Sequence, residues 1–179
     1  SEGNAQRART RGWIAAALFL AVFLVYAPAL RYPFLDYDDP DYVTANRYVR
    51  AGVSAEGLVR ALEPGPAGNW HPLTWISHML DCQFFGLNAS AQHLINLGLH
   101  IVNTLLLLML LWQMTGATWR SALVAGLFAL HPCHVESVAW ISEQKNTLST
   151  VFYLAAALAW LRFEDDRRPS RYAIATVWF

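Results

Sequence analysis

Four carboxylates lie within six positions of the sequence, and their types and spacing suit proton transfer or cation binding. The four residues are Asp36, Asp38, Asp39 and Asp41. Adjacent carboxylates such as Asp38 and Asp39 repel each other, so near a low-dielectric surface one of the two pKa values is expected to rise, as a general base requires. The same pair would also hold a divalent cation through its oxygens. A solvated Asp-Asp-Pro turn is the plainest interpretation, and spacing does not choose among the three.

A second candidate lies in residues 131–136, with the sequence His-Pro-Cys-His-Val-Glu. His131, His134 and Glu136 are of the types that bind zinc, although their spacing differs from the His-Glu-x-x-His pattern. Pro132 disturbs the helix that such a site needs. A structured break in a helix is therefore favoured over a zinc site.

Two further features bring polar groups next to apolar sequence. Glu143 and Lys145, the only lysine of the chain, lie in a short polar turn before an apolar run. That turn is either solvated or contacts phosphate at the headgroup level. The other feature is a polar stripe within about 100° of a helical projection, which would face other helices or a water-filled cavity. Its members are His93, Asn96, His100, Asn103 and Thr104.

The apolar runs that carry these residues are long enough to cross a membrane. The chain of 179 residues is 55% hydrophobic and 15% charged, whereas soluble domains contain about 25% charged residues. About 20 apolar residues in a helix cover the ~30 Å hydrocarbon core. We expect an all-α, polytopic membrane protein with spans at 13–29, 94–114, 122–141 and 148–163 and a fifth starting at 172. The formal net charge of zero disfavours a nucleic-acid partner.

The arginines indicate how these spans are oriented. Arginines precede the first span, lie between the second and third at Arg120, and follow the fourth. The positive-inside rule then places the N-terminus in the cytoplasm and the loop 30–92 outside. Within that loop, Ser54 is expected to cap a short helix that runs to Leu62. Residues 72–85 form an amphipathic helix that we expect to lie in the membrane plane, with Trp70 and Trp75 at the interface.

An ordered set of motifs resembles a known family. The motifs are Asp38-Asp39, Asn-Trp-His-Pro-Leu-Thr-Trp at 69–75, His-Leu-Ile-Asn at 93–96, His-Pro-Cys-His-Val-Glu-Ser-Val-Ala-Trp at 131–140 and Glu-Gln-Lys-Asn at 143–146. Together they resemble the N-terminal membrane region of bacterial transmembrane-and-tetratricopeptide-repeat proteins. That family is similar to the O-mannosyltransferases of the GT-C glycosyltransferase superfamily. No repeat of 34 residues is present in this sequence, so we expect the repeats and the remaining spans beyond Phe179.

The resemblance implies a membrane glycosyltransferase that moves a sugar from a polyprenyl-phosphate donor to a hydroxyl of a protein acceptor. It places the protein in a bacterial inner membrane with the active site on the outer face. It assigns the catalytic carboxylate to Asp38 or Asp39. The donor phosphate would contact Lys145 or Arg31, with Glu143 nearby, and a divalent metal stays possible. The residues expected to line the cavity are His71, His93, His100, His131, His134 and Glu136.

The sequence is also compatible with two other classes of protein. A non-enzymatic membrane anchor for a tetratricopeptide-repeat domain would need neither the acidic pair nor the polar stripe. A metallohydrolase would use the zinc site of residues 131–136. The two cysteines, Cys82 and Cys133, are expected to be buried apolar residues, with one bridge between them possible.

Overall fold

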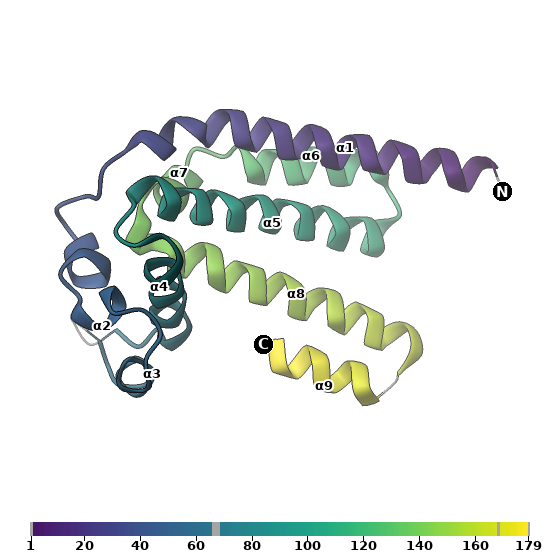
Figure 1. Cartoon of the computed structure of the whole chain (residues 1–179). Coiled ribbons are helices and arrows are strands. Elements are labelled where there is room, and N and C mark those ends of the chain that lie inside the picture. The colour runs from purple at the N-terminus through teal and green to yellow at the C-terminus, as the bar shows by residue number, and fades with distance from the viewer. Residues whose placement is uncertain (1, 66–68, 168, 179) are drawn as a thin grey trace. The chain divides into compact units, whose positions relative to one another are not determined.

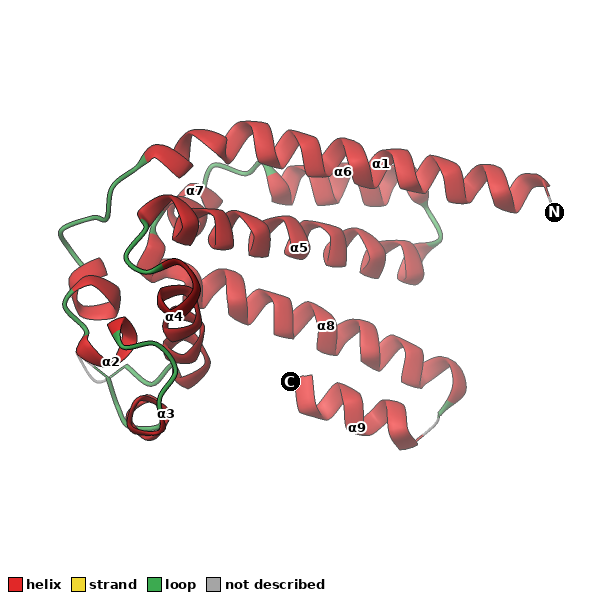
Figure 2. Ribbon diagram, viewed as in Figure 1, coloured by secondary structure: helices red, strands yellow, loops and turns green. Residues whose placement is uncertain are grey.

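The computed structural model describes residues 2–65, 69–167 and 169–178, and every regular element in these ranges is helical (Figures 1 and 2). The chain divides into two compact units. The bundle unit comprises Ser1–Val25, Leu99–His134 and Ser149–Phe179, and the loop unit comprises Tyr26–Gly98 and Val135–Leu148. Three long helices each contribute residues to both units. The all-α fold expected from the sequence is confirmed for the described residues.

The bundle unit is built from long apolar helices. They are α1 (Glu2–Tyr26), α5 (Ala89–Thr115), α6 (Thr118–Ala129), α8 (Gln144–Asp166) and α9 (Pro169–Trp178). Ile14 of α1, Leu108 of α5 and Ala125 of α6 form one buried cluster. The Arg11 guanidinium lies 5.3 Å from the centre of the Trp112 ring, a distance at which a cation is attracted to the ring face.

Two helices in the described part of the chain are long and apolar enough to cross a membrane. One runs from Gly3 to Arg31, through α1 and the 3-10 turn η1 (Ala27–Arg31), and the other is α5. Their 29 and 27 residues rise about 40 Å, which exceeds the ~30 Å hydrocarbon core.

The helix of the expected third span is broken, as the position of Pro132 predicts. α6 ends at Ala129, and α7 (His134–Ala139) begins after a turn in which the His134 N–H donates to the His131 carbonyl at 3.0 Å. The exposed Cys133 lies in this turn, whereas Cys82 is buried, and both thiols are free. The expectation that Cys133 is buried was therefore wrong, because the break exposes the residues that a continuous helix would have packed.

The loop unit consists mainly of short helices, two of which have side-chain caps. Besides η1, α4 (Pro72–Phe85) and the ends of longer helices, it contains η2 (a π-helical turn, Pro40–Thr44), α2 (Arg47–Arg50), α3 (Ala55–Ala61), α7 and η4 (Ile141–Glu143). Asn46 caps α2 by accepting from two backbone N–H groups, and Ser54 caps α3 by accepting from the Gly57 N–H at 3.0 Å. The predicted Ser54 cap is confirmed, and α3 ends at Ala61, one residue before the predicted end at Leu62. A buried core joins these helices: Tyr42, Val43, Val49, Ala61, Trp75, Met79, Cys82 and Ile141.

Helix α4 (Pro72–Phe85) turns its polar face toward the interior of the loop unit. Its Thr74, His78 and Asp81 are buried, whereas Leu73 and Phe84 are exposed. A helix with this distribution suits an apolar surrounding on its outer side.

The two tryptophans expected at the membrane interface differ. Trp70 is exposed, but Trp75 is buried and stacks on Tyr42 with ring centres 4.8 Å apart. The interfacial expectation for Trp75 was therefore wrong, because the aromatic stack takes this side chain into the core.

Candidate active site

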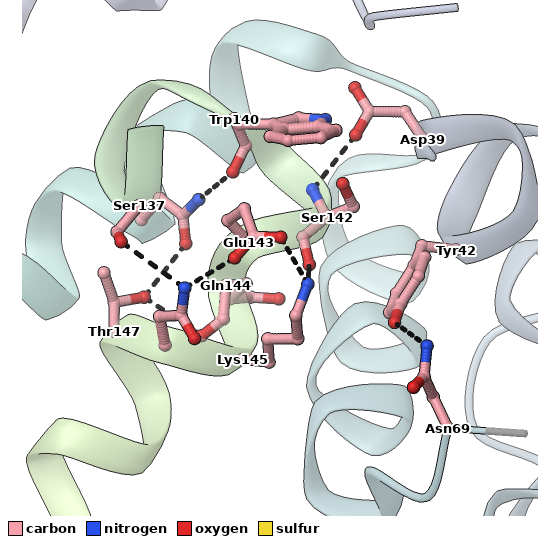
Figure 3. Close-up of polar contacts among 12 residues, drawn as sticks. Asp39, Tyr42, Asn69, Ser137, Trp140, Ser142, Glu143, Gln144, Lys145 and Thr147 are labelled. Atoms are coloured by element: carbon pink, nitrogen blue, oxygen red, sulfur yellow. Dashed lines mark hydrogen bonds and ion pairs between the residues drawn. The ribbon is translucent and has the colours of Figure 1, made fainter. Parts of the chain in front are cut away.

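The candidate site lies in the loop unit, where Asp39 meets the segment that leads into α8 (Figure 3). The Asp39 side chain is only 1% exposed. Its Oδ1 accepts the Ser142 backbone N–H at 3.0 Å, and its Oδ2 accepts the Leu35 backbone N–H at 2.8 Å. Both carboxylate oxygens are thus acceptors for the protein's own backbone, and Asp39 ties residues 103 positions apart in the sequence.

Asp38 differs from its neighbour although the two are adjacent. It is half-buried, and its backbone carbonyl accepts the Tyr42 N–H at 3.0 Å. Over the described residues, no side chain or backbone group hydrogen-bonds to the Asp38 carboxylate. The oxygens of Asp38 are therefore available to a ligand, whereas those of Asp39 are already used.

Lys145 is the second residue of α8, three positions after Ser142, whose N–H donates to Asp39. Its Nζ donates to a Glu143 carboxylate oxygen and lies 3.4 Å from the Ser142 carbonyl oxygen. The same ammonium lies 5.2 Å from the centre of the Tyr42 ring. Ser142 thus connects the two charged groups, since its N–H binds Asp39 and its carbonyl binds Lys145. The arrangement places a cation and a carboxylate on one short segment.

The first turns of α5 hold this segment from another side. Asn96 Nδ2 donates to the Trp140 carbonyl at 2.9 Å, and Asn96 Oδ1 accepts from the Thr147 hydroxyl at 3.2 Å. The Trp140 ring contacts the Tyr37 ring, with centres 5.8 Å apart. The segment that carries Lys145 is therefore fixed at both of its ends.

The buried polar face of α4 contacts the same segment. Asp81 Oδ2 accepts from Gln144 Nε2 at 3.0 Å, and both side chains are buried. Burial raises the pKa of Asp81 from 3.8 to about 6, and the Gln144 bond partly opposes this. Burial, with a smaller contribution from the Lys145 charge, lowers the pKa of His78 to about 3. His78 is thus neutral at pH 7, so its Nδ1, 3.9 Å from Asp81 Oδ2, forms no ion pair.

A cavity of about 300 Å³ opens beside Asp41, which follows the aspartate pair closely in sequence. Asp41, Arg47 and Arg60 contribute its charged lining, and Tyr48 and Trp75 its aromatic lining. This volume is at the lower end of the range for ligand pockets, and the mixed lining suits a polar chain with both backbone and side-chain contacts.

The other predicted residues of the loop unit occupy different environments. His93 is buried and meets the Tyr32 ring edge-on, with centres 6.3 Å apart. His71 is half-buried just before α4, and Arg31 and Glu136 are exposed. The structure thus brings Asp39, Glu143 and Lys145 together, and it adds residues that sequence reasoning did not assign to the site: Tyr42, Asp81, Ser142 and Gln144. Of these, Asp81 had a sequence signal, since it shares one face of α4 with His78.

The remaining predicted histidines belong to the bundle unit, where they contact one another. The rings of His100 and His134 are 5.3 Å apart, and those of His131 and His134 are 6.4 Å apart. His100 Nε2 hydrogen-bonds with the Ala129 carbonyl at 2.9 Å. The polar stripe of α5 is buried throughout, as expected. Among the described residues, no three His, Cys, Asp or Glu side chains are grouped so that they could hold a metal ion, so the zinc hypothesis for Glu136 and its neighbours gains no support.

Comparison with known proteins shows similarity to protein O-mannosyl-transferases. Protein O-mannosyl-transferase Tmtc1 of Drosophila melanogaster is 30% identical over 152 residues, which cover 81% of this chain and 18% of the relative. Tmtc2 of the same species is 30% identical over 78% of the chain and 16% of the relative, and TMTC1 of Mus musculus 30% over 85% and 17%. The chain therefore spans less than a fifth of the length of these relatives. No protein-family model and no solved structure matches it.

Proposed function

We propose that this chain is part of an integral-membrane glycosyltransferase that moves a sugar, mannose or one like it, from a polyprenyl-phosphate donor to a hydroxyl of a protein acceptor. One observation carries the proposal. Of two adjacent aspartates, Asp39 uses both carboxylate oxygens to hold the segment that bears Lys145, whereas no described residue hydrogen-bonds to the carboxylate of Asp38. The names of the relatives, protein O-mannosyl-transferases, support the same reaction.

The residues divide the reaction between them. Asp38 removes the proton from the acceptor hydroxyl as that oxygen attacks the anomeric carbon of the sugar. The bond between the anomeric carbon and the phosphate oxygen breaks, and the phosphate leaves with the electron pair. Lys145, shifting from Glu143 toward the phosphate, stabilises the charge that develops there. Asp39 keeps both groups in position, and Arg31 is a second cation for the donor phosphate.

The acceptor polypeptide approaches through the cavity beside Asp41. Pro40 and Asp41 line this cavity and directly follow Asp38 and Asp39 in sequence, so a peptide bound there extends toward the free carboxylate within a few residues at about 3.3 Å each. We place the reaction on the outer face of a bacterial inner membrane, with the N-terminus cytoplasmic and with a GT-C architecture completed by further spans and tetratricopeptide repeats. A divalent cation stays a prediction, to be tested with a chelator.

The test separates an enzyme from a membrane anchor for a repeat domain. In the full-length protein, Asp38→Asn should abolish sugar transfer to acceptor peptides, measured by mass spectrometry of glycopeptides, while membrane insertion is kept. Asp36→Asn is the matched control, because Asp36 lies in the same turn and is exposed. Transfer by the Asp38 variant at the wild-type rate would refute the proposed role of this carboxylate. No transfer by the wild-type protein with any lipid-linked sugar would favour the anchor.

A further inference from the structure

The buried carboxylate of Asp81 has no part in the reaction as described, although it contacts the segment that carries Lys145. Asp81 lies on α4 and is 6% exposed, and Gln144 lies at the first position of α8 and is 1% exposed. Their hydrogen bond of 3.0 Å joins residues 63 positions apart. Burying a charged group costs considerable free energy. If this position served stability alone, a hydrophobic residue would be favoured there over Asp81.

We propose that Asp81 is a positioning residue, which through Gln144 holds residues 142–145 where the Ser142 N–H meets Asp39 and Lys145 faces the substrate. Gln144 lies between Glu143 and Lys145, so a displacement of its side chain moves both charged groups. The Thr147 hydroxyl also lies 3.0 Å from the Gln144 carbonyl oxygen, and it shares its one proton between this oxygen and Asn96 Oδ1. Gln144 is thus held by its side chain toward α4 and by its backbone within α8. The part of the inference that concerns Lys145 and the donor rests on the proposed function.

The surroundings of Asp81 make it sensitive to the loss of this bond. His78 faces it from the same helix, and neither ring nitrogen of His78 has a hydrogen-bond partner within the residues that the structure describes. Cys82 follows Asp81 in sequence, and the positive charge of Lys145 on α8 helps to lower the pKa of His78. Gln144 is therefore the one group among these that donates a hydrogen bond to the carboxylate of Asp81. Without it, the hydrogen bonds that still join the segment to Asp39 and to α5 are those of the Asp39 carboxylate and the Asn96 side chain.

Hydrogen–deuterium exchange tests the positioning role without any substrate. In the full chain in detergent micelles, Asp81→Leu should speed exchange at residues 142–145 roughly ten- to hundredfold, the factor that matches loss of one buried hydrogen bond to a charged group. Asp81→Asn keeps an acceptor for Gln144 and should restore slow exchange. Thr74→Val is the matched control, because Thr74 is buried on the same face of α4, and it should leave residues 142–145 unchanged.

Unchanged exchange in the Asp81→Leu protein would overturn the proposal. If that variant loses protection over the whole chain, Gln144→Leu decides: faster exchange confined to residues 142–145 supports the proposal, and wild-type exchange there overturns it. In the full-length protein, Asp81→Leu should also raise the KM for a polyprenyl-phosphate sugar about tenfold more than it lowers kcat. Because exchange is measured without donor, a failure of the proposed transferase activity is distinguishable from a failure of the positioning role.

Discussion

Replacing Asp39 by Asn separates its role as an anchor from the chemistry assigned to Asp38. The Asn side chain has one acceptor oxygen in place of two, so only one of the two backbone N–H donors keeps a bond. The oxygen is expected to face the Ser142 N–H, because Ser142 is fully buried whereas Leu35 is 46% exposed and its N–H can bond to water. The variant therefore loses the hydrogen bond from the Leu35 N–H, and the Ser142 N–H donates to a neutral amide oxygen in place of a charged carboxylate oxygen.

The expected destabilisation follows from these two losses. A hydrogen bond to a charged group contributes about 1.5–3 kcal/mol and a neutral one about 1 kcal/mol. Asp39→Asn should thus lower the free energy of unfolding by about 2 kcal/mol. Asp39→Leu removes both acceptors and leaves the buried Ser142 N–H without a partner, so it should lower it by about 4 kcal/mol. Asp38→Asn breaks no hydrogen bond in the described chain and should change it by less than about 0.5 kcal/mol.

Thermal unfolding in detergent, followed by circular dichroism, measures these differences. A change of 1 kcal/mol shifts Tm by about 2–4 °C in a chain of this length, so Asp39→Asn should lower Tm by about 4–8 °C. Asp38→Asn provides the reference with the same change of charge. Equal Tm values for the two Asn variants would refute the assignment of Asp39 as the structural member of the pair.

Three further changes test the loop unit. The pKa of His78 is lower in the folded than in the unfolded chain, so the unfolded chain binds the proton first and stability falls as the pH drops below 6.5. His78→Leu should therefore remove about 2 kcal/mol of the stability loss between pH 6.5 and pH 4.5, measured by chemical unfolding at the two pH values. Asn46→Ala should lower stability by about 1 kcal/mol in the same assay through loss of the α2 cap, and Asn46→Asp should restore it. Gly52→Ala should cost about 1–2 kcal/mol, because Gly52 has a φ of +75° and an added Cβ would lie 3.1 Å from the Gln83 Cβ.

Much of the local structure of this chain could be predicted from its sequence. The Ser54 cap, the start of α4 at Pro72 and the break around Pro132 follow from side-chain and backbone geometry within a few residues. The burial of the polar stripe on α5 follows from its helical spacing, because a helix places residues three or four positions apart on one face. These features depend on contacts close in the sequence, so their signals are local.

Packing between distant segments decided the candidate site. The sequence does not distinguish the roles of the adjacent residues Asp38 and Asp39. Only the hydrogen bond from the Ser142 N–H shows that Asp39 has a structural role, whereas no described residue binds the carboxylate of Asp38. Similarly, the periodicity of α4 shows that Asp81 lies on a polar face, but its burial against Gln144 depends on how the helices meet. A hydrogen bond between residues 63 or 103 positions apart has no counterpart in local spacing, because its geometry is set by tertiary packing.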